Sequence, residues 1–487
     1  MLAVVAPGQG SQTPGFLTPW FEFFEADAAM GAFSAKLVAG WSERAALDLR
    51  HLGTTADADE IKDTAKAQPL LVLGGLTGAG ALFAGNASAI SLVAGHSVGE
   101  ITAAALANVI QGDDALSLVA ARGREMAKAA AGSESGMSAV LGGDREEVVA
   151  HLISLGLTPA NENGAGQIVA AGSLTALAAL AENPPAGSRV RALAVSGAFH
   201  TSVMQPAVSV LADLAAQIAI KRANIAVDQI DSIIFATISY PYQAPSAATE
   251  LAARLGANKA AAFDISAACA GFTYGVGMAA DFIRGGSAKY VLVVGGEKLS
   301  DFTDPTDRAT AFIFADGVGA VIIGPSESVG IGPTIWGSDV TNRDAITLEP
   351  SFLEFKNGKS VEDVGWPNIA QEGQRVFRWA VYEMAPVGRL AIEAAGITAA
   401  DLAAFIPHQA NERIIDSLVK SMGIPDSVEV ARDIRTTGNT SSASIPLAMD
   451  QLLIEHPDLH GKNALLIGFG AGLVYAAQVV ELPPKPN

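Results

Sequence analysis

The sequence predicts an α/β fold divided between at least two domains, and three observations lead to that prediction. The chain has 487 residues, more than one ordinary hydrophobic core accommodates. From Met1 to about Ala219, apolar strand-like runs alternate with Ala-rich helical runs, which is typical of α/β proteins. From about Ile220 the pattern changes, because a segment of helix-turn-strand character occurs twice.

The amino-acid composition limits the kinds of partner that the protein is expected to bind. With 31 basic and 50 acidic residues the net charge is −19, so no net positive field favours nucleic acid. One cysteine, Cys269, allows neither an internal disulfide nor a Cys-rich metal site. The N-terminus lacks the basic region of a signal peptide, and the charge-free stretch Ala67–Gly99 is punctuated by glycine. We therefore expect a cytoplasmic protein without nucleic-acid or membrane partners.

The first section contains the following predicted elements in order. Strands are expected at 2–6 and 91–94, and helices at 100–108 and 115–131. Between about 136 and 191, short strands flank two helices at 146–155 and 174–182, which predicts a small α+β insert.

The second section contains an internal repeat. "AIKRANIAVDQIDSIIFAT" (219–237) is similar to "AIEAAGITAADLAAFIPHQ" (391–409), and each reads as a helix end, a short turn and a buried strand. The repeat predicts two similar halves, at about 220–329 and 330–487. The two sections, 1–219 and 220–487, join inside a continuous helix-like run.

The stretch "LVAGHSVGE" has the Gly-x-Ser-x-Gly form of a nucleophile elbow. An apolar strand precedes Ser97 and a helix follows it, so backbone N–H groups at the helix start can stabilise an oxyanion. His200 in "SGAFHTS" is the best candidate for the base. Taken alone, the motif also fits a serine in a tight turn without chemistry.

Four motifs in the first section resemble malonyl-CoA:acyl carrier protein transacylase: "APGQGSQ", "GHSVGE", "AARGREM" and "GAFHTSVMQPA". The resemblance implies an α/β-hydrolase-like core with a ferredoxin-like insert. It implies Ser97 as nucleophile, His200 as base, and Arg122 as the residue that holds the malonyl carboxylate. Gln9 and the Val98 N–H would form the oxyanion hole. The resemblance ends near Ile218, before the segment that orients the histidine in that family.

Cys269 lies in "FDISAACAGF", after a predicted strand and before a predicted helix. A thiol at a helix N-terminus has a lowered pKa and is a better nucleophile, although a buried cysteine is also a common core filler. His408 and Asn411 in "IPHQANERII" and Asn439 in "RTTGNTSSASIP" follow in the sequence. Histidine and asparagine side chains can both donate hydrogen bonds.

These stretches, with "DRATAFIFADGVGA" and "GFGAGLVYAA", resemble the beta-ketoacyl-acyl carrier protein synthase III family, which has a thiolase-like αβαβα fold. By resemblance, Cys269 accepts an acyl group from acyl-CoA. His408 and Asn439 bind the thioester of malonyl-acyl carrier protein while carbon dioxide leaves. The carbanion then attacks the acyl-cysteine, with the acyl oxygen held by the N–H groups of Cys269 and Gly472.

The same resemblance implies binding residues and partners. Acyl carrier protein, malonyl-CoA and acetyl-CoA or another short acyl-CoA are the expected partners, without a cofactor or metal. A homodimer is expected, with Ala244 lining the acyl pocket of the partner. The residues expected to contact the carrier protein or CoA are Arg308, Arg378, Asn411, Arg413 and Lys420.

The resemblance also implies that two parts are absent from this chain. One is the loop with the tryptophan and arginine that clamp the CoA adenine. The other is the first strand, which we expect at the centre of the first sheet, where its loss would leave buried N–H and C=O groups unpaired at roughly 1–3 kcal/mol each. Two readings therefore stay open: a bifunctional enzyme, or a fusion with one or both activities lost that acts at most as a carrier-protein docking module.

Overall fold

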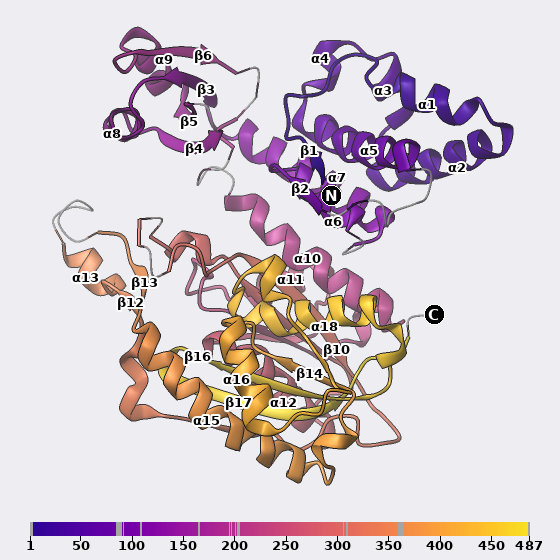
Figure 1. Ribbon diagram of the computed structural model, residues 1–487, viewed down its shortest axis with the longest axis vertical. Helices are drawn as coiled ribbons and strands as arrows, with labels where there is room; N and C mark the ends of the chain where they lie inside the picture. Colours follow the sequence, from indigo (N-terminus) through magenta and orange to yellow (C-terminus); the bar gives the residue numbers. More distant parts are fainter. Residues whose placement is uncertain are drawn as a thin grey trace. The chain divides into compact units, whose positions relative to one another are not determined.

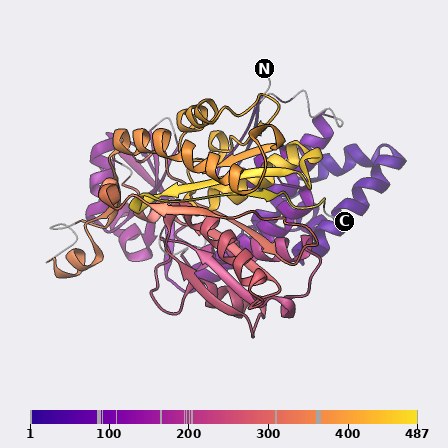
Figure 2. The same cartoon turned by 90° about the horizontal axis from the view of Figure 1, so that it is seen from below.

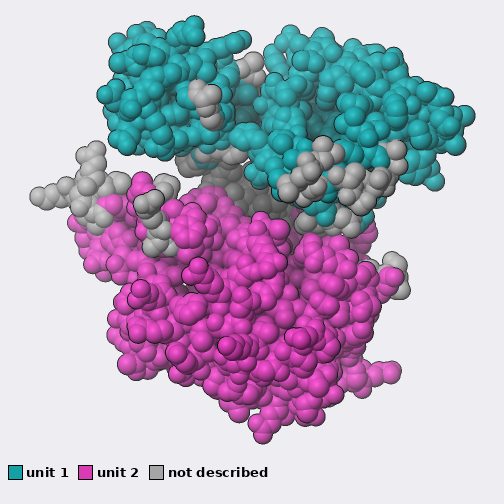
Figure 3. All heavy atoms as spheres, viewed as in Figure 1, with its two compact units in different colours: residues 1–211 teal, residues 212–487 magenta. Residues whose placement is uncertain are grey.

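A computed structural model describes residues 3–83, 90, 92–107, 110–163, 166–193, 195, 197–199, 201, 205–304, 306–307, 310–358 and 365–485. The chain divides into two compact units, Met1–Leu211 and Ala212–Asn487 (Figure 3). The division falls within helix α10 (Gln205–Arg222), the helix-like run in which the sequence places its joint at 219/220.

In unit 1, strand β1 (Ala3–Ala6) pairs in parallel with β2 (Leu92–Gly95), as predicted. Among the described residues, this sheet has only these two strands. Val5 and Leu92 are 71% and 56% exposed, so apolar strand residues of this sheet face solvent. The α/β-hydrolase-like core of this unit is therefore a reduced one.

Helices build most of the rest of this core. Leu70 and Leu73 of α5 are fully buried, as are Leu116 and Val119 of α7, and the two helices pack against each other. None of the helices within the described ranges is long and apolar enough to cross a membrane. The helices are α1 (Thr18–Glu25), α2 (Ala28–Ala45), α3 (Leu49–Thr54), α4 (Ala58–Ile61), α5 (Thr64–Phe83), α6 (Gly99–Leu106) and α7 (Gly112–Ala131).

The insert is a four-stranded antiparallel sheet in the order β4-β5-β3-β6 with two helices, which is a ferredoxin-like arrangement. Its elements are β3 (Ser135–Gly142), α8 (Arg145–Ser154), β4 (Thr158–Asn163), β5 (Gln167–Ser173), α9 (Leu174–Glu182) and β6 (Ser188–Ala192). The sequence prediction missed β4, because "TPANEN" is polar and contains proline. Such a strand is tolerated at the sheet edge, where β4 pairs only with β5.

Unit 2 contains two main sheets with helices on both faces of each (Figures 1 and 2), and a separate two-stranded sheet formed by Ile346–Glu349 and Asn368–Gln371. Helices α10 and α11 cover one face of the first sheet, α12 and α18 lie between the sheets, and α15 and α16 cover the second. Because both faces are covered, every residue of the run Val291–Val294 is buried, and alternate side chains enter different cores. This is the αβαβα architecture that the sequence predicted.

The first sheet has the order β10-β9-β7-β8, and the second β11-β17-β16-β14-β15. The strands are β7 (Ser232–Ala236), β8 (Ala261–Ile265), β9 (Val291–Glu297), β10 (Gly317–Ile323), β11 (Ile335–Ser338), β12 (Ile346–Glu349), β13 (Asn368–Gln371), β14 (Ala404–Pro407), β15 (Glu429–Val430), β16 (Asn463–Gly470) and β17 (Val474–Glu481). The helices are α11 (Ala247–Leu255), α12 (Gly271–Arg284), α13 (Phe352–Asn357), α15 (Gly373–Ala394), α16 (Glu412–Met422), α17 (Ile434–Thr437) and α18 (Ser444–Glu455).

The predicted internal repeat is confirmed. The end of α10, the short turn Val227–Gln229 and β7 correspond to the end of α15, the turn Ala399–Asp401 and β14. Both strands are fully buried and lie between two neighbours in their sheets.

The expected position of the missing strand was wrong. When the two sheets are matched strand by strand, β7, β9 and β10 correspond to β14, β16 and β17. The strand without a counterpart is β11, which lies at the edge beside β17. In the first sheet β7 pairs directly with β9 over Ser232–Ala236, so no central ladder is broken. The loss falls on the outer edge of β10, where unpaired groups can reach solvent at much lower cost.

Candidate active sites

Ser97 lies on a strained turn between β2 and α6. Its φ of 54° is in the left-handed region, which a non-glycine residue seldom adopts without support. The flanking glycines are required by close packing: a Cβ on Gly95 would lie 2.2 Å from Gly99, and a Cβ on Gly99 would lie 2.2 Å from the Ala6 carbonyl oxygen. The predicted nucleophile elbow is therefore present in the backbone.

Arg122 on α7 lies beside this serine. Its guanidinium donates to Ser97 Oγ at 3.3 Å and to Gln68 Oε1 at 2.6 Å. Burial lowers the pKa of Arg122 and nearby Glu100 raises it, but a guanidinium stays charged in any protein environment. A largely buried cation next to the nucleophile suits a substrate that carries a carboxylate. The sequence analysis missed Gln68, which fixes the direction of this guanidinium.

The structure describes two of the other three residues predicted for the serine site. Val98, directly after the serine, is fully buried at the start of α6. The Gln9 side chain donates to Thr64 Oγ1 at 3.0 Å. His200, predicted as the base, lies outside the described residues.

Cys269 lies in a 3-10 turn (Ala268–Ala270) directly before α12, as predicted, and it lines a cavity of about 450 Å³. His408, Asn439 and Ser441 line the same cavity. The remaining lining is mostly apolar and comes from both halves of the unit, including Leu299, Phe302, Phe314, Leu348, Ile369 and Phe469. The three residues that the sequence predicted for one chemical site therefore meet in one cavity.

The expected low pKa of the thiol was wrong. The pKa of Cys269 is raised to about 12, chiefly by burial; the Ser441 hydroxyl lowers it in part, and the charge of Glu297 contributes a smaller increase. The helix N-terminus does not outweigh desolvation here, so the resting group is a thiol rather than a thiolate.

His408 follows β14 and is 2% exposed, and its ring lies edge-on to Phe469. Burial lowers the pKa of this histidine to about 3, so the imidazole is neutral at pH 7. Its Nδ1 is 2.7 Å from Ser444 Oγ, and that oxygen also accepts the Gln409 backbone N–H at 3.3 Å. The Ser444 hydroxyl hydrogen is thereby left for Nδ1, which favours the tautomer with N–H at Nε2. His408 therefore has a neutral N–H donor at Nε2.

Asn439 is 5% exposed and is held by its own backbone. Its N–H donates to the Ile313 carbonyl at 2.9 Å, and its carbonyl accepts the Ala315 N–H at 2.9 Å. Its side-chain Oδ1 accepts the Ser441 N–H at 2.9 Å. Because the oxygen end of the amide is engaged, the NH₂ end is the part left to donate to a ligand in the cavity.

The backbone around the predicted acyl-oxygen site is tightly packed against the cysteine. A Cβ on Gly470 would lie 2.7 Å from the Cys269 backbone nitrogen, so only glycine fits there. Gly470, Ala471 and Leu473 line the cavity, whereas Gly472, the predicted residue, does not. The N–H of Ala471 is therefore the better candidate partner for that of Cys269.

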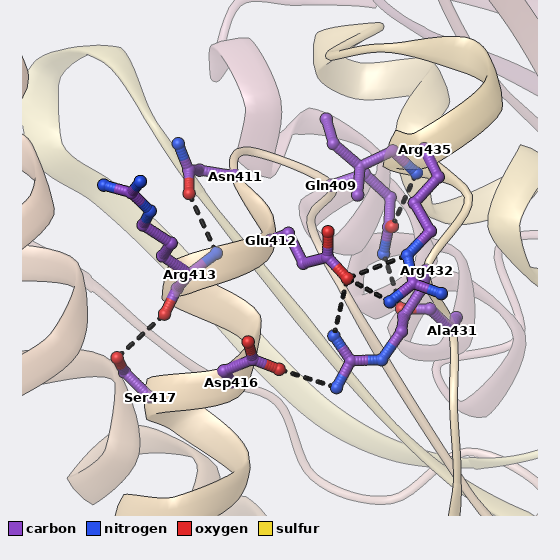
Figure 4. Close-up of polar contacts among 10 residues, drawn as sticks. Gln409, Asn411, Glu412, Arg413, Asp416, Ser417, Ala431, Arg432 and Arg435 are labelled. Atoms are coloured by element: carbon purple, nitrogen blue, oxygen red, sulfur yellow. Dashed lines mark hydrogen bonds and ion pairs between the residues drawn. The ribbon is translucent and has the colours of Figure 1, made fainter.

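The predicted basic residues lie on α15 and α16. Arg378, Arg413 and Lys420 are exposed, and Asn411 caps α16 by accepting the Arg413 backbone N–H at 2.9 Å. Two further arginines are bound by acids: Glu412 accepts from Arg435 at 2.8 Å, and Asp416 pairs with Arg432 at 2.7 Å. Arg413 points away from this cluster (Figure 4).

Ala244 is not among the residues that line the cavity. Ala244 is exposed and precedes a cis proline, and Arg308 lies outside the described residues. The described part of the chain contains no cluster of three or more His, Cys, Asp or Glu side chains that could hold a metal ion.

Comparisons with known proteins identify the families of both parts of the chain. Residues 4–253 match the acyl transferase domain model, and residues 263–340 and 392–482 match the 3-oxoacyl-[acyl-carrier-protein] synthase III model and its C-terminal model. A beta-ketoacyl-[acyl-carrier-protein] synthase III of Streptomyces glaucescens is 58% identical over 265 residues, which are 54% of this chain and 79% of that protein. One of Kocuria rhizophila is 50% identical over 307 residues, 58% of this chain and 86% of that protein.

Among solved structures, the priming beta-ketosynthase of the R1128 polyketide pathway has a TM-score of 0.56 at 35% identity, covering 73% of this chain and 98% of its own. The fold and these comparisons together define an α/β protein with two domains, both of acyl-transferring enzyme types. The chain belongs to the 3-oxoacyl-[acyl-carrier-protein] synthase III family, fused behind an acyl transferase domain. This combination of two domains is consistent with fatty acid biosynthesis, as the sequence predicted.

Proposed function

We propose that the chain catalyses two consecutive steps: transfer of malonyl from CoA to acyl carrier protein at Ser97, and condensation of that product with an acyl-CoA at Cys269. The observation that carries the proposal is the single cavity of about 450 Å³ lined by Cys269, His408 and Asn439. A thiol and two neutral donors in one mostly apolar cavity suit acyl transfer followed by decarboxylation.

In the condensation, the Cys269 sulfur attacks the acyl-CoA thioester and CoA leaves as its thiol. Malonyl-carrier protein then places its thioester oxygen against His408 Nε2–H and the Asn439 amide. Both donors are neutral and buried, so they stabilise the enolate that forms as carbon dioxide departs. The enolate carbon attacks the acyl-cysteine, whose carbonyl oxygen is held by the backbone N–H groups of Cys269 and Ala471.

In the transfer step, Ser97 forms a malonyl ester and passes the group to the carrier thiol. Arg122 binds the free malonyl carboxylate with the same guanidinium that now contacts Ser97 Oγ. His200 is the proposed base, and Gln9 with the Val98 N–H the proposed oxyanion hole. No cofactor or metal takes part in either step.

Docking of the acidic carrier uses exposed cations near the mouth of the cavity. Asn411 and Ile414, at the start of α16, line the cavity, and Arg413 lies between them in sequence with an exposed side chain. Arg378 and Lys420 extend this basic surface, and Arg308 is assigned to it on the family resemblance. We also propose that the synthase unit forms a homodimer in which Ala244 lies at the acyl pocket of the partner. The proposed location is the cytoplasm.

The test is a product assay with purified chain, holo-carrier protein, malonyl-CoA and acetyl-CoA. We expect 3-oxoacyl-carrier protein by mass spectrometry, and Ser97→Ala should block it unless the carrier is supplied already malonylated. Formation of no product even from malonyl-carrier protein would contradict the condensation half and favour a docking module.

A matched arginine pair tests the docking surface. Arg413→Ala is expected to raise the KM for carrier protein about 5- to 30-fold with kcat nearly unchanged, because an exposed cation contributes binding energy equally before and during the reaction. Arg435→Ala should change the KM less than about twofold, since Glu412 already neutralises that guanidinium. Steady-state kinetics at two salt concentrations measure both, and equal effects of the two variants would contradict the assignment.

A further inference from the structure

A buried carboxylate next to the cysteine has no part in the chemistry described so far. Glu297, the last residue of β9, is 6% exposed. Its Oε2 accepts hydrogen bonds from Thr237 Oγ1 at 3.1 Å, the Ile238 N–H at 3.1 Å and Ser239 Oγ at 2.6 Å. Its Oε1 accepts from Ser441 Oγ at 3.2 Å. Burial raises the pKa of Glu297 above its ordinary value, while these four hydrogen bonds stabilise the carboxylate form and lower the pKa in part.

The direction of these bonds leaves one oxygen able to take a proton. Thr237 Oγ1 accepts the Ser239 N–H at 3.2 Å, and Ser239 Oγ accepts the Lys298 N–H at 2.7 Å. Each hydroxyl therefore gives its own hydrogen to Glu297, and Oε2 is saturated with donors. Within the described part of the chain, Ser441 is the only hydrogen-bond partner of Oε1, so a proton that reaches Glu297 arrives through Ser441.

Ser441 connects this carboxylate to the nucleophile. Its φ of 51° places it in the left-handed region, and its N–H is held by Asn439 Oδ1. Its hydroxyl interacts with the Cys269 thiol, and both residues line the same cavity. One hydroxyl thus lies between the sulfur and the carboxylate, on the loop that also carries the donor Asn439.

We propose that Cys269, Ser441 and Glu297 form a proton relay in which Glu297 acts through Ser441 to receive the thiol proton. This inference rests on the proposed role of the cavity in acyl transfer. As the sulfur attacks the thioester carbonyl, the S–H proton passes to Ser441 Oγ and the Ser441 proton passes to Glu297 Oε1. The new S–C bond forms, the C–S bond to CoA breaks, and the proton returns through Ser441 to the departing CoA thiolate.

The relay explains how a thiol with a raised pKa can react at neutral pH. Burial raises the pKa of both groups, which disfavours loss of the Cys269 proton to solvent and makes the Glu297 carboxylate a stronger proton acceptor. The forms thiol–carboxylate and thiolate–carboxylic acid have the same total charge. Conversion between them moves a proton within the cluster and needs no change in the charge that is buried.

Other titratable side chains on the neighbouring elements do not replace Glu297 in this role. His408 is neutral, and Asp264 accepts two backbone N–H groups at the start of α11. Lys298 pairs with Asp301, Asp316 accepts from Ser300, and neither Lys298 nor Asp316 lines the cavity.

The experiment measures alkylation of Cys269 by iodoacetamide, followed by mass spectrometry of the intact chain between about pH 6.5 and 8.5. In the native chain the rate should change less than about twofold, because the proton moves inside the cluster. In Glu297→Gln and in Ser441→Ala, deprotonation must go to solvent, and the rate should rise about tenfold per pH unit. Ser442→Ala removes a neighbouring hydroxyl that binds the Ala236 carbonyl instead, and it should keep the flat profile.

The two relay variants protect the test against a folding defect, because each breaks a different link. A native rate that itself rises about tenfold per pH unit would overturn the relay. So would flat profiles in both Glu297→Gln and Ser441→Ala. Since iodoacetamide needs no CoA or carrier protein, these outcomes are independent of whether the condensation assay yields product.

Discussion

Replacement of Asn439 or His408 by alanine is expected to lower the rate of decarboxylation of malonyl-carrier protein by about 10²- to 10³-fold each, the usual effect of removing one oxyanion donor. Both side chains are buried, and their remaining polar atoms are engaged, so each presents one donor group to the cavity. Release of carbon dioxide from labelled malonyl-carrier protein measures the rate.

Acylation of Cys269 by acetyl-CoA serves as the internal reference, because it does not require the enolate. It should persist in both variants, so the loss is confined to one step. His456→Ala, which removes an exposed imidazole paired with Glu429, should leave decarboxylation unchanged. A decarboxylation rate near the native value in both cavity variants would contradict the assigned roles.

The second large effect concerns Arg122. Arg122→Ala should lower the rate of malonyl transfer to Ser97 by about 10²- to 10³-fold. Removing one partner of a buried guanidinium–carboxylate pair costs about 2–5 kcal/mol. The same variant should lose its preference for malonyl-CoA over acetyl-CoA, because the neutral acetyl group makes no such pair. Single-turnover loading with each thioester measures both quantities.

Arg124 on the same helix is the matched control. Its guanidinium donates to the Ala45 carbonyl rather than toward the serine. Arg124→Ala should therefore keep both the malonyl rate and the preference. An Arg122→Ala chain that loads malonyl at the native rate would assign the carboxylate to another residue.

Much of the fold was predictable because local signals and the internal repeat agree. The strand-turn-helix around Ser97, the turn before α12 and both copies of the helix-turn-strand segment are all present. The family resemblance led us to expect the missing strand at the sheet centre, and the sequence could not correct this because strand order is set by pairing between distant segments. Only the observed order of the second sheet shows that its counterpart, β11, is an edge strand.

The candidate chemical residues lie in sequence motifs, whereas their contacts in the fold are not visible in those motifs. Ser97, Cys269, His408 and Asn439 each lie in a recognisable stretch. Gln68 reaches Arg122 across 54 positions, and Ser441 reaches Glu297 across 144. Such pairs have no local pattern. The raised pKa of Cys269 was also missed, because desolvation depends on how two sheets enclose the thiol.

The central claim is that Ser97 and Cys269 are separate thioester-handling centres on one polypeptide. Intact-mass spectrometry after exposure to malonyl-CoA or acetyl-CoA tests it most directly. We expect a malonyl adduct that disappears in Ser97→Ala and persists in Cys269→Ala, and an acetyl adduct with the opposite dependence. Absence of both adducts from the native chain, or loss of both in a single variant, would contradict the claim.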